Sequence, residues 1–450
     1  MIPMDYDLVI VGTGTAGTNA AFVCSSGGMR VAIADFRPYG GTCALRGCAP
    51  KKVLVGATST LAHAKRMQGL GMFGPDLEFD WGSLIRFKRS FTDLIPEKRM
   101  HYYKRNGIDT YSGVATFRGP DSLYVGEEAL SSRYFLVASG SVPRKLNIPG
   151  EGHLLTSEDF MELDKLPESI IFVGGGYISF EFSHVAASAG AEVKIIHKGP
   201  NPLPGFDGAV VKRLLDATKA LGIEVILDSQ VASIESNEKG VMVKSTKNRE
   251  FLYSEADCAV HGAGRVPELD ALALDNANVD HSSKGVIVNS FLQSTSNPNV
   301  YAAGDVVQGR PMLKALAEHE GIIAGNNILH GNKLEMDYSV TPSVLFTMPE
   351  MASVGLTEGQ AKAEGLDYVV KEMDMSSWFS SRHIGMGNAY SKVIKDKAHD
   401  HILGAHLICP RAGDLINVFA LAIKAKMPAR ELKEIPWAFP TNTSDLAYMV

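Results

Sequence analysis

The stretch YDLVIVGTGTAGTNAA, residues 6–21, defines the architecture of the first part of this chain. An apolar run typical of a buried parallel strand leads into Gly12, Gly14 and Gly17, and small residues then begin a helix. A second apolar run, VAIAD, ends at Asp35, 23 residues after Gly12. The glycines let the backbone turn tightly and approach a pyrophosphate, and the carboxylate can accept from ribose hydroxyls. We therefore expect a Rossmann-like dinucleotide-binding domain here.

The same pattern recurs at residues 170–199, IIFVGGGYISFEFSHVAASAGAEVKIIHKG. Gly174, Gly176 and Ser179 stand at the fingerprint spacing after an apolar strand, so the chain offers a second dinucleotide site. The expected fold class is α/β, with two Rossmann-like nucleotide-binding domains.

The end of the second strand in this repeat indicates which nicotinamide cofactor binds. An NAD site usually has a carboxylate there, which would repel a 2′-phosphate, whereas this sequence has His197 followed by Lys198. A cation would pair with that phosphate. NADPH is therefore favoured over NADH, and a solvated polar turn is the alternative interpretation of the two residues.

Composition and charge argue against several other classes of protein. The chain has 44 Lys and Arg residues against 50 Asp and Glu, a net charge of −6, so it has no excess positive charge for nucleic acid. No apolar run approaches the roughly 18 residues of a membrane span, and the start MIPMDYDLVIVG has no secretory signal pattern. We expect a cytoplasmic protein that binds neither nucleic acid nor membrane.

Two of the five cysteines, Cys43 and Cys48, stand in GGTCALRGCAPKK, residues 40–52. In a regular helix they would be about 7.5 Å apart along the axis, beyond the roughly 7 Å Cα limit for an unstrained disulfide. A bridge therefore needs local distortion, and strained bridges are more easily reduced. Pro50 suits a loosened first helical turn, and a helix N-terminus with nearby lysines would lower a thiol pKa.

Three roles for this cysteine pair compete. A zinc site would need two further ligands, and no second C-x-x-C or H-x-x-x-H motif accompanies the pair. A structural disulfide is disfavoured in a reducing compartment. The sequence favours a redox-active pair without a metal, and we expect Cys24, Cys258 and Cys409 to be buried core residues.

A third strand-like segment, NVYAAGDVVQGRPMLKALAEHEG at residues 299–321, contains Gly304 and Asp305 ahead of a helical pattern. Following two nucleotide-binding domains, it is expected to return to the first domain and complete its site.

Four motifs together resemble the pyridine nucleotide-disulfide oxidoreductases: GGTCALRGCAPKKVLV, VGGGYISFEF, VASGSVPRKLNIPG and VYAAGDV. The cysteine motif is most similar to that of glutathione reductases, and TPSVLFTMPEMASVGLTEGQA and ILGAHLI are similar to the family's α+β dimerisation domain. The resemblance implies a homodimer. It also implies an FAD-binding domain over residues 1–145 and 266–335, an NAD(P)H-binding domain over 146–265 and a dimerisation domain over 336–450.

The resemblance also implies roles for single residues. Asp35 and Asp305 would hold ribose and ribityl hydroxyls of FAD, and Ala115 would contact adenine through its backbone. Lys52, paired with Glu181, would stabilise the reduced flavin. Other residues expected at FAD are Gly41, Thr42, Ser139, Gly140 and Gly304, and those expected at NADPH are Tyr177, Ile178, Gly264 and also Glu181.

The mechanism that the resemblance implies has NADPH reducing the flavin, which opens the disulfide through Cys48. Cys43 is then free to attack a disulfide substrate.

The chain departs from this family at its C-terminal segment, AFPTNTSDLAYMV, residues 438–450. Family disulfide reductases have a His-Pro-Thr-x-Ser-Glu type segment there, whose histidine protonates the leaving thiolate. Phe439 occupies the histidine position, and Ser444 the glutamate position. The candidate replacements for this acid are Tyr448, Asp445, and His319 with Glu320. The alternatives are an acceptor that needs no acid, such as a disulfide with a leaving thiol of low pKa, a quinone or a metal ion, and slow turnover of ordinary disulfides.

Two positions also depart from the glutathione reductase pattern. Phe22 and Ile322 occupy positions where those enzymes have arginines that grip the substrate carboxylates. Arg46, between the two cysteines, is a possible substrate contact. The expected function is therefore an FAD-dependent NADPH:disulfide oxidoreductase acting on a small disulfide or related acceptor. The alternatives are a dihydrolipoamide-dehydrogenase-like enzyme and an NAD(P)H-dependent quinone or metal-ion reductase in which the disulfide is accessory.

Overall fold

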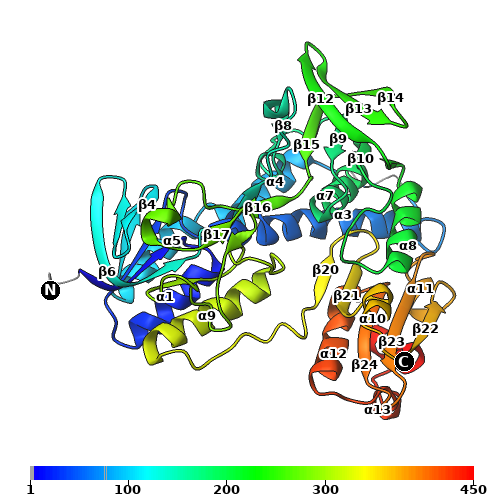
Figure 1. The fold of residues 1–450 in the computed structure, drawn as a ribbon. Helices are drawn as coiled ribbons and strands as arrows, with labels where there is room; N and C mark the ends of the chain where they lie inside the picture. Colours follow the sequence, from blue (N-terminus) through cyan, green and yellow to red (C-terminus); the bar gives the residue numbers. More distant parts are fainter. Residues whose placement is uncertain (1–4, 75–76, 78) are drawn as a thin grey trace. The chain divides into compact units, whose positions relative to one another are not determined.

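A computed structural model describes residues 5–74, 77 and 79–450 of the chain (Figure 1). The described residues form two compact units. Unit 1 comprises residues 5–51, 86–144 and 265–337, and unit 2 comprises residues 52–85, 145–264 and 338–450. Helices α3 (Cys48–Met67) and α4 (Trp81–Thr92) each cross a limit between the two.

Unit 1 is built on a sheet whose centre is parallel. Its parallel strands, in the order β3-β2-β1-β6-β19, are β3 (Ile108–Ser112), β2 (Val31–Asp35), β1 (Tyr6–Val11), β6 (Glu128–Val137) and β19 (Val300–Ala302). The start of β6 also pairs antiparallel with β5 (Ser122–Val125), which pairs with β4 (Ala115–Gly119). The apolar runs of the sequence therefore form the buried centre of this sheet, as expected for a Rossmann-like domain.

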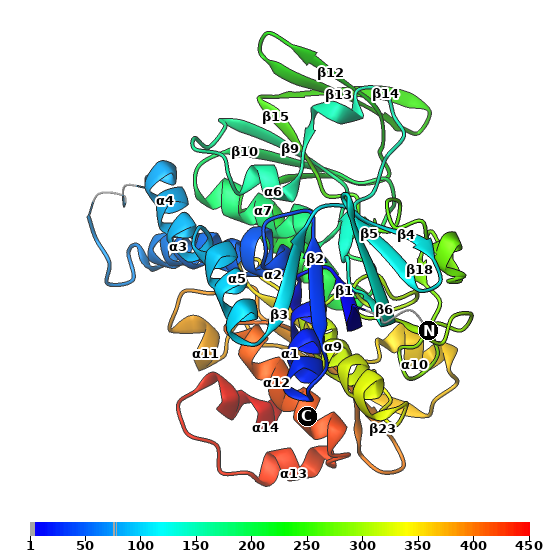
Figure 2. The same ribbon diagram turned by 90° about the vertical axis from the view of Figure 1, so that its left-hand side faces the viewer.

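The helices of unit 1 pack closely because small residues separate them. They are α1 (Thr15–Ser26), α2 (Gly41–Arg46), α5 (Ile95–Arg105), α9 (Lys314–His330) and the short η2 (Leu274–Ala277). A Cβ atom on Gly321 of α9 would lie 2.3 Å from the backbone oxygen of Ala16 in α1. Figure 2 shows α1 and α9 side by side. Glycine at this position therefore sets the spacing between the two helices.

Short paired strands complete unit 1. Strand β7 (Ser141–Pro143) pairs antiparallel with β16 (Arg265–Pro267), and β17 (His281–Ser282) with β18 (Gly285–Val286). The first pair joins the two chain segments that lead out of unit 1 and back into it.

Unit 2 contains a second parallel sheet, in the order β11-β10-β9-β15-β8. Its strands are β11 (Glu224–Ile226), β10 (Glu192–Ile196), β9 (Ser169–Val173), β15 (Cys258–His261) and β8 (Leu154–Leu155). Its helices are α6 (Ser157–Phe160), α7 (Tyr177–Ser188) and α8 (Gly208–Ala220), with η1 (Glu151–His153), and an antiparallel sheet comprises β12 (Gln230–Asn237), β13 (Gly240–Lys247) and β14 (Glu250–Ala256).

The C-terminal part of unit 2 is an antiparallel sheet with helices, shown in yellow to red in Figure 1. Its strands, in sheet order, are β20 (Ser343–Leu345), β21 (Met351–Gly355), β24 (Ile402–Ile408), β23 (Tyr390–Asp396) and β22 (Tyr368–Asp374). Its helices are α10 (Glu358–Ala363), α11 (Phe379–Arg382), α12 (Ala412–Lys424), α13 (Ala429–Glu434), η3 (Asn442–Asp445) and α14 (Leu446–Met449). Buried Phe419 and Ile416 of α12 join its core.

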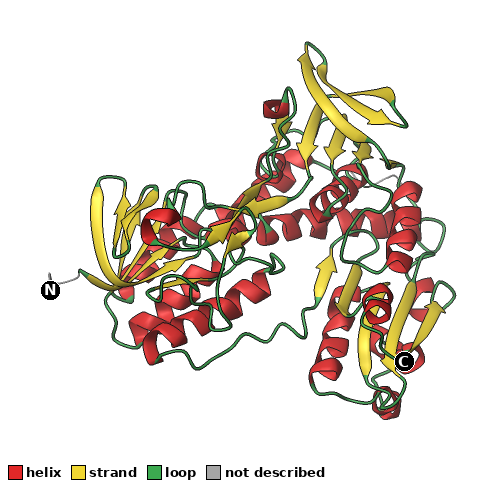
Figure 3. Ribbon diagram, viewed as in Figure 1, coloured by secondary structure: helices red, strands yellow, loops and turns green. Residues whose placement is uncertain are grey.

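The expected fold class is confirmed: two Rossmann-like sheets and an α+β C-terminal part make up the chain (Figure 3). The proposed domain limits remain a prediction. They lie within two residues of the limits of unit 1 at 144, 265 and 337, but residues 52–85 group with unit 2. The first four residues of the expected FAD-binding domain lie outside the described residues. Among the described residues, no helix is long and apolar enough to cross a bilayer.

The spacing of α1 and α9 gives a testable prediction with a matched control. Alanine is a better helix former than glycine, so Gly56→Ala in α3, where a Cβ meets nothing within 4 Å, should raise the free energy of unfolding by about 0.5–1 kcal/mol. Gly321→Ala makes the same chemical change but forces the new methyl against Ala16, so it should lower stability by about 1–3 kcal/mol. Thermal and denaturant unfolding of the two variants should shift in opposite directions, and equal shifts would contradict this role for Gly321.

Candidate active site

The two cysteines of the redox motif lie on either side of a break between helices. Helix α2 ends at Arg46, Gly47 has φ −146° and ψ −112°, and α3 begins at Cys48. This is the local distortion that a pairing of Cys43 with Cys48 was expected to need. Pro50 occupies the first turn of α3, as expected. Both cysteines are free thiols here, with Cys43 half-buried and Cys48 exposed.

The surroundings of Cys43 act on its thiol pKa in both directions. A hydrogen bond with Cys48 and burial raise the pKa of Cys43, while the charge of Lys314 lowers it. Two thiols in contact do not ionise independently. The expectation of a lowered thiol pKa at the helix terminus named neither sulfur, and it stays a prediction.

The first glycine-rich turn forms a backbone cradle at the N-terminus of α1. Gly12 has φ +107°, and a Cβ there would lie 2.2 Å from the carbonyl oxygen of Ala138. Gly41 has φ +68°, and its Cβ would lie 2.3 Å from Cα of Gly14. Gly14 caps α1 without a side-chain hydrogen bond, and the first turn has no acidic residue. This cradle fits a pyrophosphate, whose charge the helix N-terminus favours.

Asp35 lies at the end of β2 and is held toward this turn. Its Oδ2 accepts hydrogen bonds from the backbone N of Thr13 at 2.9 Å and from the Thr13 hydroxyl at 2.6 Å. Its Oδ1 accepts from the backbone N of Arg37 at 3.0 Å. The structure thus brings Asp35 together with the turn of Gly12 and Gly14, as a ribose-binding role requires.

The segment after β19 returns to unit 1 with Gly304 and Asp305. Oδ2 of Asp305 accepts from the Ser141 hydroxyl at 2.8 Å, and burial raises the pKa of this carboxyl. Arg265 donates to the same hydroxyl at 2.9 Å, and its charge offsets part of this rise in the pKa of Asp305. Gly304 has φ +83°, and its N–H donates to Glu320 at 2.6 Å.

The remaining residues expected at FAD also lie in unit 1. The Ser139 hydroxyl donates to the backbone oxygen of Glu268 at 2.6 Å, and Gly140 has φ +81°. The others are Gly17 in α1, Thr42 in α2 and Ala115 at the start of β4. Their contacts with a cofactor stay a prediction.

The second glycine-rich turn has a serine in place of the third glycine. Gly174 has φ +111°, and its Cβ would lie 2.5 Å from Cα of Ala263. A Cβ on Gly262 would lie 1.9 Å from the hydroxyl oxygen of Ser179, so a glycine on the facing strand end leaves room for the serine. Gly176 caps α7 without a side-chain hydrogen bond. The turn therefore fits a dinucleotide as the first one does.

The other residues expected at NADPH also lie near this turn in the chain. Tyr177, 47% exposed, and Ile178 begin α7, and Gly264, with φ +107°, follows β15. His197 is half-buried above Gly175, and its Nε2 lies 3.2 Å from the backbone oxygen of Asn201. Burial lowers the pKa of His197, which favours its neutral form. Lys198, the next residue, is exposed.

Lys52 and Glu181 both contact Phe346 in unit 2. Lys52 Nζ lies 3.7 Å from the centroid of the Phe346 ring and 3.4 Å from Oε1 of Glu350. The buried Glu181 accepts from the backbone N of Phe346 through Oε1 at 2.9 Å. The contacts described for Lys52 are thus with Glu350 and Phe346, and its pairing with Glu181 stays a prediction.

The candidate acids of the sequence are spread over both units. Phe439, at the position of the family histidine, is 80% exposed. Tyr448 is exposed and packs edge-on against Trp378 at 5.9 Å between ring centroids, and burial raises the pKa of Asp445.

In unit 1 the remaining candidates have other surroundings. His319 is exposed, and Glu320 is the acceptor for Gly304 noted above. Arg46 lies close enough to Glu268 to lower the pKa of that carboxyl. A role for any of these residues stays a prediction.

Phe22 has a structural explanation. Its ring packs against Tyr102 at 4.6 Å and Tyr103 at 5.9 Å between centroids, in the aromatic edge of the core. A phenylalanine here contributes packing and offers no charge to a carboxylate.

Three influences on the site were not found from the sequence: the charge of Lys314 acting on Cys43, and the contacts of Glu350 and Phe346 with Lys52. Lys314 is the first residue of α9. Its position after the Gly-Asp segment is the only feature of the sequence that could have pointed to it. Glu350 is 298 residues from Lys52, beyond the reach of any local pattern.

Comparison with known proteins adds a family to this geometry. The model of the pyridine nucleotide-disulphide oxidoreductases matches residues 6–321, and that of their dimerisation domain matches residues 341–449. A glutathione reductase of Burkholderia cepacia is 30% identical over 440 residues, which is 97% of this chain and 96% of that protein. A dihydrolipoyl dehydrogenase of Bacillus subtilis (strain 168) is 29% identical over 445 residues, 98% of this chain and 94% of that protein.

A solved structure shares the whole fold. It is a Cu(II) complex of a cysteine-to-serine mutant of RclA, an HOCl-induced flavoprotein disulfide reductase from Escherichia coli. Its TM-score is 0.89 at 25% identity, with 99% of each chain covered. Together with the two glycine-rich turns and the cysteine pair, these matches show that the chain belongs to the pyridine nucleotide-disulphide oxidoreductases, a family of FAD-dependent enzymes that use NAD(P)H.

Proposed function

We propose that this chain transfers electrons from NADPH, by way of FAD, to the Cys43–Cys48 pair and from there to a small disulfide. The observation that carries the proposal is the contact of the two sulfurs across the helix break at Gly47. A metal ligand role would need further ligands at this place, and the group of possible ligands found among the described residues lies elsewhere, at Asp396, His399 and His401.

The residues that would hold FAD are those of the first turn, with Asp35 and Asp305. Bound FAD would supply the two-electron relay between the nicotinamide and the cysteine pair. The chain itself would donate backbone N–H groups to the pyrophosphate. The carboxylates of Asp35 and Asp305 would accept hydrogen bonds from the hydroxyls of FAD.

The thiol chemistry then follows from the two sulfurs. Once reduced, Cys43 loses its proton and its thiolate attacks one sulfur of the substrate disulfide, which releases one substrate thiolate. Cys48 attacks the sulfur of Cys43 in the mixed disulfide, releases the second thiolate and restores the Cys43–Cys48 bond. Each leaving thiolate takes up one proton, so one disulfide is exchanged for another with no further oxidant.

The acceptor is expected to have a leaving thiol of low pKa. Phe439 cannot protonate a leaving thiolate, and a thiol of low pKa needs no acid to leave. Phe22 packs in an aromatic cluster and Ile322 is apolar, so neither offers a cation to the carboxylates of glutathione disulfide. A small disulfide without those carboxylates suits these residues best.

A second candidate function is reduction of a quinone or metal ion, with the disulfide accessory. The missing acid favours it, because these acceptors release no thiolate. RclA, to which this chain is similar, is described as a flavoprotein disulfide reductase in a Cu(II) complex. A dihydrolipoamide-dehydrogenase-like activity is favoured by several relatives of that name but must also work without the family histidine.

Two further parts of the proposal rest on the family. The dimerisation domain at residues 341–449 supports a homodimer. Few cysteines and the reducing chemistry of the pair support a cytoplasmic location.

The roles of the two cysteines can be separated by spectroscopy and turnover. Anaerobic addition of NADPH to the FAD-loaded protein should produce a long-wavelength thiolate-to-flavin charge-transfer band. Cys48→Ser should lose the band, whereas Cys43→Ser should keep it and lose disulfide turnover, and the control Cys258→Ser should resemble the parent. If Cys43→Ser still reduces disulfides, Cys43 is not the outer nucleophile; if it loses disulfide turnover but reduces quinones or metal ions as fast as the parent, the second candidate function is favoured.

The cofactor preference depends on the cation at Lys198. Lys198→Glu should lower kcat/KM for NADPH by about tenfold to a hundredfold, because a hydrogen bond to a charged group contributes about 1.5–3 kcal/mol. The effect on NADH should be small. Lys219→Glu, which changes the same charge at the exposed end of α8, is the control and should leave the ratio of the two cofactors unchanged. A parent enzyme that prefers NADH would contradict the assignment.

Restoring the missing acid tests why glutathione disulfide should be a poor substrate. Phe439→His should raise its steady-state turnover, up to the roughly 10²–10⁴-fold that a positioned general acid contributes. Phe251→His, at an exposed phenylalanine of β14, should give no gain. If Phe439→His also gives none, the missing histidine does not limit this reaction.

A further inference from the structure

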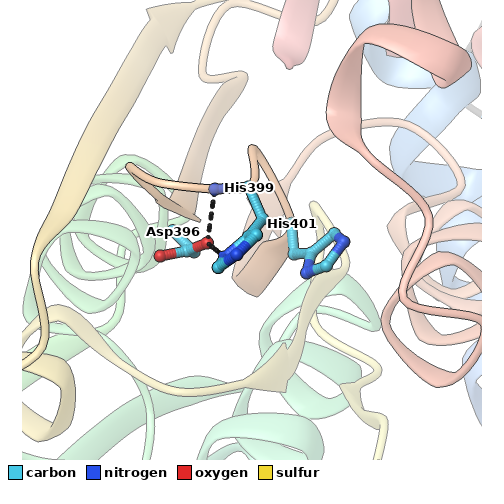
Figure 4. Close-up of side chains that lie close together, drawn as sticks. All are labelled: Asp396, His399 and His401. Atoms are coloured by element: carbon cyan, nitrogen blue, oxygen red, sulfur yellow. Dashed lines mark hydrogen bonds and ion pairs between the residues drawn. The ribbon is translucent and has the colours of Figure 1, made fainter.

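The hairpin between β23 and β24 brings together three side chains that the redox chemistry does not use. Asp396 ends β23, and His399 and His401 lie in the connection that leads to β24 at Ile402 (Figure 4). One possible ligand atom from each lies within 4.8 Å of those of the other two. The close-up shows the carboxylate of Asp396 and the ring of His399 directed toward each other, with His401 beside them.

The local backbone holds the Asp396 carboxylate in place. Its Oδ2 accepts from the backbone N of His399 at 2.7 Å and from Nδ1 of the same ring at 2.8 Å, and Oδ1 accepts from the N of Ala398 at 3.3 Å. The backbone N of Asp396 in turn donates to the oxygen of His401 at 2.8 Å. The three residues are therefore fixed on one closed turn, and little chain entropy would be lost on bringing them around an ion.

The distances suit a small cation. Two ligands that are each about 2.0–2.1 Å from a metal, at right angles to one another, are about 2.9 Å apart. The Nδ1 to Oδ2 distance of 2.8 Å is close to this value, so both atoms could bind one ion after the His399 ring turns its Nδ1 lone pair from the carboxylate toward the ion. The rings of His399 and His401 stack at 5.5 Å between centroids and 17° between planes, so His401 must turn toward the other two side chains to complete the set.

The neighbouring cations pair with other carboxylates. Lys395 pairs with Asp400 at 3.0 Å and Lys397 with Asp367 at 3.4 Å. Within the described residues, the only ion pair recorded for Asp396 is with His399. A divalent ion would thus meet the Asp396 carboxylate without having to displace a lysine.

We propose that Asp396, His399 and His401 bind one divalent first-row transition metal ion, with Cu²⁺ bound most tightly and Ni²⁺ or Zn²⁺ less so. Two imidazole nitrogens and one carboxylate oxygen match the ligand preference of these ions, whereas Mg²⁺ and Ca²⁺ prefer oxygen ligands throughout. His399 is 72% exposed at its side chain, so water completes the coordination sphere. The ion would brace the hairpin, and the proposal does not depend on the identity of the electron acceptor.

The test uses the full-length, untagged, FAD-loaded protein, freed of metal with a chelator and kept oxidised so that the cysteine pair is a disulfide. Cu²⁺ binding is measured by competition with a chromophoric chelator and by electron paramagnetic resonance. One Cu²⁺ per chain with nitrogen couplings is expected. His399→Gln and His401→Gln should each weaken binding at least tenfold, and His330→Ala, at an exposed histidine at the end of α9, should leave it unchanged.

Asp396→Asn provides a second line of evidence, since its one side-chain oxygen can still accept from the backbone N of His399. It should weaken Cu²⁺ binding, and added Zn²⁺ should raise the melting temperature of the parent, relative to its own metal-free form, more than that of the variant. The proposal is overturned if the histidine variants bind Cu²⁺ as the parent does. It is also overturned if Cys43→Ser with Cys48→Ser, rather than the histidine variants, removes the ion.

Discussion

The close approach of two glycines, Gly14 and Gly41, is the constraint on which the active site of unit 1 depends. A Cβ on Gly41 would lie 2.3 Å from Cα of Gly14, so only a bare backbone can bring α2 against the dinucleotide turn. The N–H of Gly40 donates to the Thr13 hydroxyl, which itself donates to Asp35. The segment that carries Cys43 is therefore fastened directly to the residues expected to hold the cofactor.

The site also requires that the two sulfurs be in contact, and the helix break at Gly47 makes this contact possible. A continuous helix would keep Cys43 and Cys48 apart, whereas two helices that meet at Gly47 let one sulfur share a hydrogen bond with the other. The hydrogen bond with Cys48 raises the pKa of Cys43, and the charge of Lys314 lowers it. The two sulfurs therefore lie where one can attack the substrate and the other can then attack the mixed disulfide, as a two-step thiol exchange requires.

Much of this architecture could be predicted because its causes are local in the sequence. The turns at Gly12 and Gly174, the carboxylate of Asp35 and the distortion between the cysteines follow from short spacings and strand or helix patterns. Contacts over long sequence separations could not be predicted, such as Lys52 with Glu350 or Lys314 with Cys43. The effect of Cys48 on the Cys43 pKa could not be predicted for a related reason: it depends on which atoms surround the sulfur, and the residue types near the cysteine in the sequence do not specify them. The same holds for His197, whose burial lowers its pKa.

The central claim is that the cysteine pair stores electrons in series with FAD, and counting electrons tests it most directly. Anaerobic reductive titration of the FAD-loaded protein is predicted to consume twice as many electrons per bound FAD as the variant with both Cys43→Ser and Cys48→Ser, because a disulfide is itself a two-electron couple. Equal consumption by the two proteins would contradict the account.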